Sequence, residues 1–243
     1  INKLSVTIDL TQPRGKELAK RIASVSDVVT QNMRPGVMER LGLGYEELKE
    51  IKPDIIYLSS SLRGSNGPER NYGGYAPNFA AVSGLSYITG YADDLPAGFT
   101  GEVDLISATT AAFSLLAALN YRLQTGEGQY IDLSSSDAIS VLIGDVLIDY
   151  IMNGRVQSRN GNVDSFMAPH NCYRCKGEDK WVSIVIADDD EWESFRIALG
   201  YPGWTADERF SDAYSRWQNR EELDRLVEQW TLTRNDYDIM KEL

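Results

Sequence analysis

The chain has 243 residues, enough for one large domain or two modest ones with a sizeable core. Its 24 basic and 36 acidic side chains give a net charge of −12, and the whole excess lies beyond residue 100. This charge argues against nucleic acid or an anionic membrane as partner, because both need a cationic face. From the sequence we expect no apolar run long enough to span a membrane. Two cysteines exclude a disulfide framework and suit the reducing cytoplasm, where we expect the protein.

The first part of the chain alternates strand and helix patterns with short connections. This order is typical of a parallel sheet covered by helices. In chain order we expect a strand at Leu4–Leu10, a helix that starts near Pro13 and contains Leu18, Ile22 and Val25, a strand at Asp27–Thr30, helices at Val37–Leu41 and Tyr45–Lys52, and a strand at Ile55–Ser59.

Two loops rich in glycine and polar residues interrupt the next part, and the first covers Arg63–Gly74. A helix at Leu105–Gln124 is apolar on most faces, which predicts that it is buried. The other expected elements are a helix at Pro77–Ser83, a strand at Gln129–Leu133 and a helix at Ser135–Met152.

The pattern then changes, and a polar stretch at residues 153–169 predicts a linker. We therefore divide the chain into a large α/β portion, residues 1–152, and a small α+β domain, residues 170–243. The small domain is expected to contain strands at Asn171–Arg174 and Trp181–Ile186 and helices at Asp189–Leu199, Arg220–Trp230 and Asn235–Leu243.

Asp104 is the strongest candidate for chemistry, because it lies between a glycine-containing loop and the long helix, in the expected N-cap position. Aspartate is favoured there simply as a cap. The functional alternative uses the same geometry, because helix N-terminal N–H groups keep a carboxylate ionised and able to act as a nucleophile. Glu102 lies two residues away and is expected to be solvated.

Other chemical motifs are weak. Cys172 and Cys175 form one CxxC within a strand-like segment, with only His170 nearby, so neither a zinc site nor a redox pair is expected. His170 is the only histidine, and no Gly-x-Ser-x-Gly motif accompanies it, which argues against a histidine-dependent hydrolase. We expect no metal and no tightly bound cofactor.

Several longer motifs resemble the class III CoA-transferase family, which includes formyl-CoA and carnitine CoA-transferases. They are QNMRPGVMERLGLGYEEL at residues 31–48, IKPDIIYLSSS at residues 51–61, GEVDL at residues 101–105 and RLQTGEGQYIDLSSSDA at residues 122–138. The segments DYIMNGRVQ, APHNCYRCKGEDKW and DDEW are similar to the aryl-succinate branch. Chains of this family are longer, so we expect this sequence to be a central portion.

The resemblance implies a Rossmann-like parallel sheet in an incomplete large domain, a smaller α+β domain and an interlocked homodimer. Asp104 matches the family's nucleophile, and Tyr75 is a substrate-binding candidate. Positions matching the coenzyme A contacts are Asn32, Met33, Val37 and Arg40, with Arg34 as a second phosphate candidate.

The implied reaction moves coenzyme A from an acyl-CoA thioester to a free carboxylic acid through an anhydride and an aspartyl-CoA thioester on Asp104. An α-methylacyl-CoA racemase is an alternative, because racemases share the fold. Their histidine matches Tyr75 here, and a phenol with a pKa near 10 is a poor base. A non-catalytic member that only binds coenzyme A is the second alternative.

Overall fold

The computed structural model describes residues 2–243 and divides them into two compact units, which meet in the chain between Arg159 and Asn160. This division falls inside the segment that the sequence predicts as a linker.

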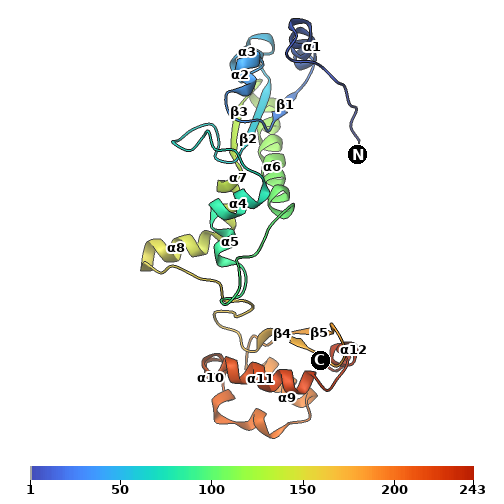
Figure 1. The fold of residues 1–243 in the computed structure, drawn as a ribbon, viewed down its shortest axis with the longest axis vertical. Helices are drawn as coiled ribbons and strands as arrows, with labels where there is room; N and C mark the ends of the chain where they lie inside the picture. Colours follow the sequence, from blue (N-terminus) through green and yellow to red (C-terminus); the bar gives the residue numbers. More distant parts are fainter. Residues whose placement is uncertain (1) are drawn as a thin grey trace. The chain divides into compact units, whose positions relative to one another are not determined.

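Unit 1 contains a three-stranded parallel sheet in the order β1-β2-β3 (Figure 1). Parallel neighbours need crossover connections, and helices supply both of them here. In chain order the elements are α1 (Pro13–Ser24), β1 (Val28–Gln31), α2 (Val37–Leu41), α3 (Tyr45–Ile51), β2 (Ile56–Ser61), α4 (Ala76–Ser83), α5 (Leu85–Ile88), α6 (Glu102–Thr125), β3 (Tyr130–Ser134), α7 (Ser135–Ser140), a 3₁₀ turn (Val141–Ile143) and α8 (Gly144–Asn153).

The middle strand carries the core of unit 1. Ile56, Tyr57 and Leu58 of β2 are all buried, which is the pattern of a strand covered on both faces. Tyr57 packs with residues of α1 and α3 and the turn between α2 and α3, while a second cluster joins α4, α6 and α7. Helices therefore cover the sheet, as the alternating sequence pattern predicts.

Two of the expected elements differ from the structure. Residues 2–9 form no strand, and Leu4 and Val6 are exposed, because no neighbouring strand among the described residues pairs with this segment. The helix expected at Ser135–Met152 is broken by the 3₁₀ turn before Gly144 and becomes α7 and α8.

The long helix α6 is far more exposed than its apolar sequence predicts. Only Val103, Ser107 and Ala118 are buried, whereas Phe113 and Leu123 are 73% and 83% exposed. Within residues 2–243, α6 is also the one helix long and apolar enough to span a membrane, which corrects the expectation that no run reaches that length. Length and composition alone are weak grounds for a membrane segment, because core helices of soluble proteins satisfy them too.

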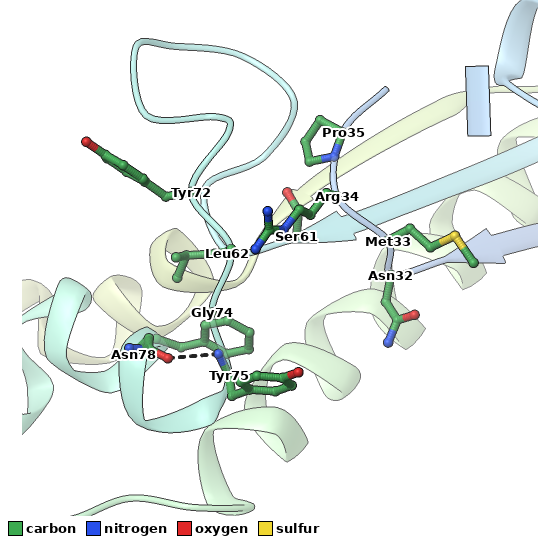
Figure 2. Close-up of a pocket in the computed structure, with 12 residues that line it drawn as sticks. Asn32, Met33, Arg34, Pro35, Ser61, Leu62, Tyr72, Gly74, Tyr75 and Asn78 are labelled. Atoms are coloured by element: carbon green, nitrogen blue, oxygen red, sulfur yellow. Dashed lines mark hydrogen bonds between the residues drawn. The ribbon is translucent and has the colours of Figure 1, made fainter. Parts of the chain in front are cut away.

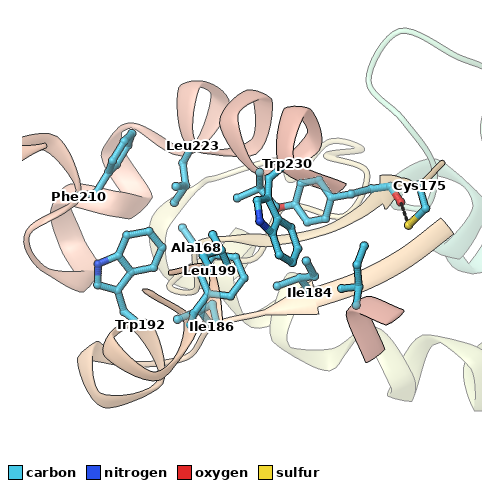
Figure 3. Packing of buried hydrophobic residues seen from close by; sticks show 13 residues of the cluster. Ala168, Cys175, Ile184, Ile186, Trp192, Leu199, Phe210, Leu223 and Trp230 are labelled. Atoms are coloured by element: carbon cyan, nitrogen blue, oxygen red, sulfur yellow. Dashed lines mark hydrogen bonds between the residues drawn. The ribbon is translucent and has the colours of Figure 1, made fainter. Parts of the chain in front are cut away.

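Unit 2 is built around a two-stranded antiparallel hairpin packed against helices (Figure 3). Its core contains Tyr173, Ile184, Trp192, Phe210 and Leu223, among others. Its elements are β4 (His170–Arg174), β5 (Trp181–Val185), α9 (Asp189–Ala198), 3₁₀ turns at Gly203–Ala206 and Glu208–Phe210, α10 (Ala213–Gln218), α11 (Arg220–Thr231) and α12 (Asp236–Glu242). The strands and the three longer helices lie where the sequence predicts them.

Candidate functional site

The carboxyl ends of the three parallel strands of unit 1 meet at one edge of the sheet. β1 leads into the turn at Asn32–Pro35, β2 into the loop at residues 62–75, and β3 into the start of α7. In open α/β sheets, ligands bind in the crevice outside these strand ends. Two adjoining hollows occupy this edge, and both are lined by Asn32 and Tyr75.

The larger hollow has a volume of about 980 Å³ and contains the candidate nucleophile Asp104. The side of this hollow formed by α6 carries small side chains, among them Ser107 and Ala111, and Ser135 of α7 also lines it. Asn32, Tyr75 and Asp104 come from three segments far apart in the sequence, so the fold unites them, as the sequence interpretation requires.

Asp104 is not the N-cap of its helix, which corrects the sequence-based expectation. The helix begins one turn earlier, with Gly101 as N-cap and Asp104 as its third residue. Its carboxylate is exposed and has no hydrogen bond or ion pair to any other of residues 2–243. First-turn N–H groups lack helical acceptors and carry the positive end of the helix dipole, so Asp104 still lies in a turn with free backbone donors.

Glu102 has a different environment from Asp104, although both lie in the first turn of α6. Its Oε2 accepts a hydrogen bond from the Thr100 N–H at 2.8 Å. Backbone hydrogen bonds, from its own N–H and from Thr100, lower the pKa of Glu102. Glu102 is exposed and does not line the larger hollow, and its carboxylate bonds to the adjacent Thr100.

The smaller hollow, of about 400 Å³, is lined by Asn32, Met33, Arg34 and Tyr75 (Figure 2). The guanidinium of Arg34 lies so close to Gly73 that a Cβ there would be 2.7 Å from its Nε. No hydrogen bond or ion pair engages this guanidinium among the described residues. A cation held beside a hollow without an acidic partner can bind phosphate or carboxylate oxygens.

Val37 and Arg40 line neither hollow. Only some of the residues expected to contact coenzyme A therefore surround the two hollows. Both residues belong to α2, directly after the turn that carries Arg34. The Arg40 side chain folds back over Gly36, where a Cβ would be 3.0 Å from its Nη1. Arg40 therefore stays beside the same turn, although it does not reach the cavity wall.

Gln31 holds the turn after β1 in place. Its Nε2 donates to the Ser59 Oγ of the neighbouring strand at 2.5 Å, and its Oε1 accepts from the Met33 N–H at 2.7 Å. The sequence interpretation missed Gln31, because its role depends on the register of β1 against β2. A polar residue at the end of an apolar strand is the only local signal.

Asp132 is a second residue that the sequence interpretation missed. It lies in β3, and its carboxylate accepts hydrogen bonds from Ser65 and Asn66 in the loop after β2. Aspartate is uncommon inside strands, and this placement in the YIDLS strand is the signal that could have identified it.

The cysteines and the histidine belong to unit 2, outside this site. His170 has its Nδ1 2.6 Å from the carbonyl oxygen of Asn162. Cys172 is exposed, whereas Cys175 is buried, and burial raises the pKa of the Cys175 thiol. Within residues 2–243 no three His, Cys, Asp or Glu side chains gather into a group that could hold a metal ion.

Comparisons with known proteins agree on one family. The family model described as CoA-transferase family III matches residues 1–243. A succinyl-CoA:D-citramalate CoA-transferase of Chloroflexus aurantiacus is 34% identical over 232 residues, covering 95% of this chain and 58% of that protein. A succinyl-CoA:mesaconate CoA-transferase of Haloarcula hispanica is 34% identical over 238 residues, covering 95% and 59%.

Solved structures lead to the same assignment. A CaiB/BaiF family protein from Brucella suis superposes with a TM-score of 0.89 at 29% identity, covering 98% of this chain and 63% of that one. Rv3272 from Mycobacterium tuberculosis gives a TM-score of 0.85 at 26% identity, covering 99% and 63%. The chain thus spans about three fifths of the length of these relatives. It belongs to CoA-transferase family III.

Proposed function

We propose that the protein transfers coenzyme A from an acyl-CoA thioester to a free carboxylic acid, with Asp104 as the covalent nucleophile. The observation that carries this proposal is the unpaired Asp104 carboxylate in the large hollow of a family III chain. A carboxylate with no competing partner is free to attack an acyl group.

The first half-reaction forms and then opens an anhydride. An Asp104 oxygen attacks the thioester carbonyl, the C–S bond breaks and coenzyme A leaves as the thiolate. The thiolate then attacks the aspartyl carbonyl of the mixed anhydride. The C–O bond to the donor breaks, the donor acid departs as its carboxylate, and Asp104 carries coenzyme A as a thioester.

The second half-reaction reverses these steps with the acceptor acid. The acceptor carboxylate attacks the aspartyl thioester, which releases the thiolate and gives a new anhydride. The thiolate attacks the acceptor carbonyl of that anhydride, forming the acceptor thioester and restoring the Asp104 carboxylate. Each attack forms a tetrahedral oxyanion, and the first-turn N–H groups of α6 are our candidates to stabilise it.

We assign coenzyme A binding to the turn after β1. Asn32, Met33 and Arg34 line the smaller hollow, and Tyr75 lines both hollows. The Arg34 guanidinium would bind a phosphate group, and Val37 and Arg40 would contact the nucleotide from α2. Arg40 is the weaker assignment, because its side chain folds over Gly36 and not into the hollow.

We also propose that the protein acts as a homodimer, which is supported by the apolar surface of unit 1. Exposed apolar side chains of this extent are typical of interaction surfaces. They include Leu105, Phe113, Leu116 and Leu123 of α6 and Ile148, Ile151 and Met152 of α8. Among the relatives, the alpha and beta subunits of a succinyl-CoA:L-malate CoA-transferase of Chloroflexus aurantiacus, 33% and 32% identical to this chain, are two different chains, so they support assembly with a related chain and not a homodimer in particular.

A thioester-exchange assay tests the proposed reaction. The protein is incubated with a panel of acyl-CoA donors and free acids, including succinyl-CoA, dicarboxylates and aromatic succinates, and new thioesters are identified by mass spectrometry. Hydroxylamine added during turnover should convert the Asp104 carboxyl group into a hydroxamate. The control reaction without acyl-CoA should leave the peptide unmodified.

The outcome separates the proposal from its two alternatives. Exchange of the α-proton without movement of coenzyme A would indicate a racemase. Binding of coenzyme A without either reaction would indicate a non-catalytic member. Transfer without any modified Asp104 peptide would contradict the covalent route.

A further inference from the structure

One face of β3 fixes the loop at residues 62–75, which forms part of both hollows. Alternate residues of a strand point to the same face, and Tyr130, Asp132 and Ser134 share this one. The Tyr130 hydroxyl lies 3.4 Å from the Ser65 Oγ, and the Ser134 Oγ donates to the carbonyl oxygen of Leu62 at 3.3 Å. All three side chains therefore contact the beginning of the loop.

Asp132 makes the most contacts of the three. Its carboxylate accepts from the Ser65 N–H at 2.9 and 3.0 Å, from the Ser65 hydroxyl at 2.6 Å and from the Asn66 amide at 3.2 Å. Gly64 has a left-handed backbone, φ +73°, and a Cβ there would be 3.4 Å from both carboxylate oxygens. The loop thus wraps its polar groups around this carboxylate, and no cation pairs with it among residues 2–243.

The anchored segment leads directly to the walls of the hollows. Arg63 and Glu69 form an ion pair of 2.8 Å across the loop, and the Tyr72 N–H donates to the Glu69 carbonyl oxygen at 2.9 Å. Gly73 then packs against the guanidinium of Arg34, and Tyr75 follows at the boundary of both hollows. The position of Arg34 and Tyr75 hence depends on where the loop is held.

We propose that Asp132 is a positioning residue, which anchors the loop at residues 62–75 and so shapes the substrate site without touching substrate. The proposal rests on the proposed function, because it takes coenzyme A as the molecule that binds beside Arg34 and Tyr75. Release of the loop should weaken binding more than it slows the chemical steps at Asp104, which belongs to a different element.

The test compares Asp132→Asn and Ser65→Ala with Ser65→Thr, which keeps the hydroxyl, and with the control Asp145→Asn. Asp145 is an exposed aspartate of α8 that makes no side-chain hydrogen bond or ion pair among the described residues. Coenzyme A itself is the binding probe, measured by calorimetry. We expect Asp132→Asn to raise its dissociation constant and the KM for acyl-CoA about tenfold, with kcat reduced less than about threefold.

Amide hydrogen exchange gives a readout that does not depend on catalysis. In Asp132→Asn the amides of residues 62–75 should exchange about tenfold faster or more, while those of β2 and α6 stay unchanged. Ser65→Ala should show a smaller effect of the same kind, Ser65→Thr should restore binding, and Asp145→Asn should match the wild type. The double variant Asp132→Asn with Ser65→Ala should lose less coenzyme A binding free energy than the sum of the losses in the two single variants.

Three results would overturn the inference. They are unchanged exchange in residues 62–75, faster exchange throughout unit 1, and a loss of kcat in Asp132→Asn without a change in coenzyme A binding. Failure of the proposed function looks different. A wild-type protein that binds coenzyme A but transfers none would refute the reaction, while the exchange and binding data would still decide the role of Asp132.

Discussion

The two units of the protein differ in where they place their polar side chains and in whether those side chains have partners. Unit 2 encloses a single apolar core and places even the guanidinium of Arg216 inside it, bonded to carbonyl groups on several segments. Unit 1 has two smaller apolar clusters and leaves Asp104 and Arg34, at the edges of its hollows, without a partner among residues 2–243. Much of its long helix is exposed.

This difference separates stability from function. Polar groups that are fully bonded within a core hold a unit together, whereas polar groups without partners in a cavity are available to a ligand. We therefore expect substitutions in unit 2 to change the free energy of unfolding, and substitutions around the hollows of unit 1 to change binding and rate. The four predictions below test this contrast.

The largest effect is expected for Asp104→Asn, which removes the proposed nucleophile at almost constant volume. Transfer should fall on the order of 10⁴-fold, as for loss of other covalent nucleophiles. The free energy of unfolding should change by less than about 0.5 kcal/mol, because the side chain is exposed and makes no hydrogen bond or ion pair among residues 2–243. Thioester exchange and urea denaturation measure the two quantities.

Glu102→Gln is the matched control, since Glu102 lies in the same turn but outside the larger hollow. It should retain near wild-type activity. An Asp104→Asn protein that is inactive because it unfolds, or an equal loss in Glu102→Gln, would contradict the division between the units.

Phe113→Asp tests whether the exposed surface of α6 is covered by a second copy of the chain. Phe113 is 73% exposed, so a charge there should not disturb the fold of the single chain. If the helix face lies in a dimer interface, the dissociation constant should rise about 100-fold, as for loss of a central aromatic contact. Sedimentation across a concentration series measures this shift, and Tyr214→Asp on α10 of unit 2 is the control. An unchanged dissociation constant, or a monomeric wild type, would refute the interface.

Arg216→Met should destabilise unit 2 by about 2–4 kcal/mol, because it leaves the buried carbonyl groups of Ala168 and Phe210 without their donor. Its guanidinium also lies 5.0 Å from the ring centroid of Trp192. Urea denaturation followed by tryptophan fluorescence measures the change, since all five tryptophans lie in unit 2.

The matched control is Arg225→Met on α11, where an exposed ion pair with Glu222 should contribute little to stability because solvent screens it. Equal effects of the two substitutions would mean that burial of Arg216 does not stabilise unit 2.

The smallest effect concerns the acid dependence of unit 2. Hydrogen bonds from Arg209 lower the pKa of Asp207 from 3.8 to about 2. Folding thus favours the ionised carboxylate, and this contribution is full above the unfolded pKa and lost as pH falls from about 4 to about 2. Thermal unfolding should show Asp207→Asn less stable than wild type at pH 5, with the difference vanishing near pH 2. Asp190→Asn, whose carboxylate has no partner within residues 2–243, should show no such convergence.

Local patterns predicted most of the secondary structure correctly. The Arg34-Pro35-Gly36 sequence ends β1 where expected, and the strands and longer helices of unit 2 lie within a few residues of their predicted bounds. The expected strand at Leu4–Leu10 is wrong, because its alternating pattern says nothing about whether a neighbouring strand exists. The burial expected for α6 is wrong for a related reason, since an apolar helix needs a surface to cover it.

The residues of the candidate site likewise fall into those that a local pattern predicted and those that it did not. Asp104 was found from its loop and helix context, and Arg34 from a motif. Asp132 was not, because its hydrogen bonds reach Ser65, which lies 67 positions earlier in the chain. Arg40 was also predicted from a motif, and the structure places its side chain over Gly36 and outside the walls of both hollows, because a motif position does not fix the direction of a side chain.

The sequence by itself determined most of the helices and strands and the family, and it indicated Asp104 as the candidate nucleophile. These depend on periodicity, on turn residues and on motifs, all of which are local in the chain. Only the tertiary structure decided that Asn32, Tyr75 and Asp104 line one cavity, that Asp132 accepts hydrogen bonds from the loop beside it, and that α6 is exposed. The physical reason is that strand register and packing join residues far apart in the sequence, and no local pattern encodes which partners meet.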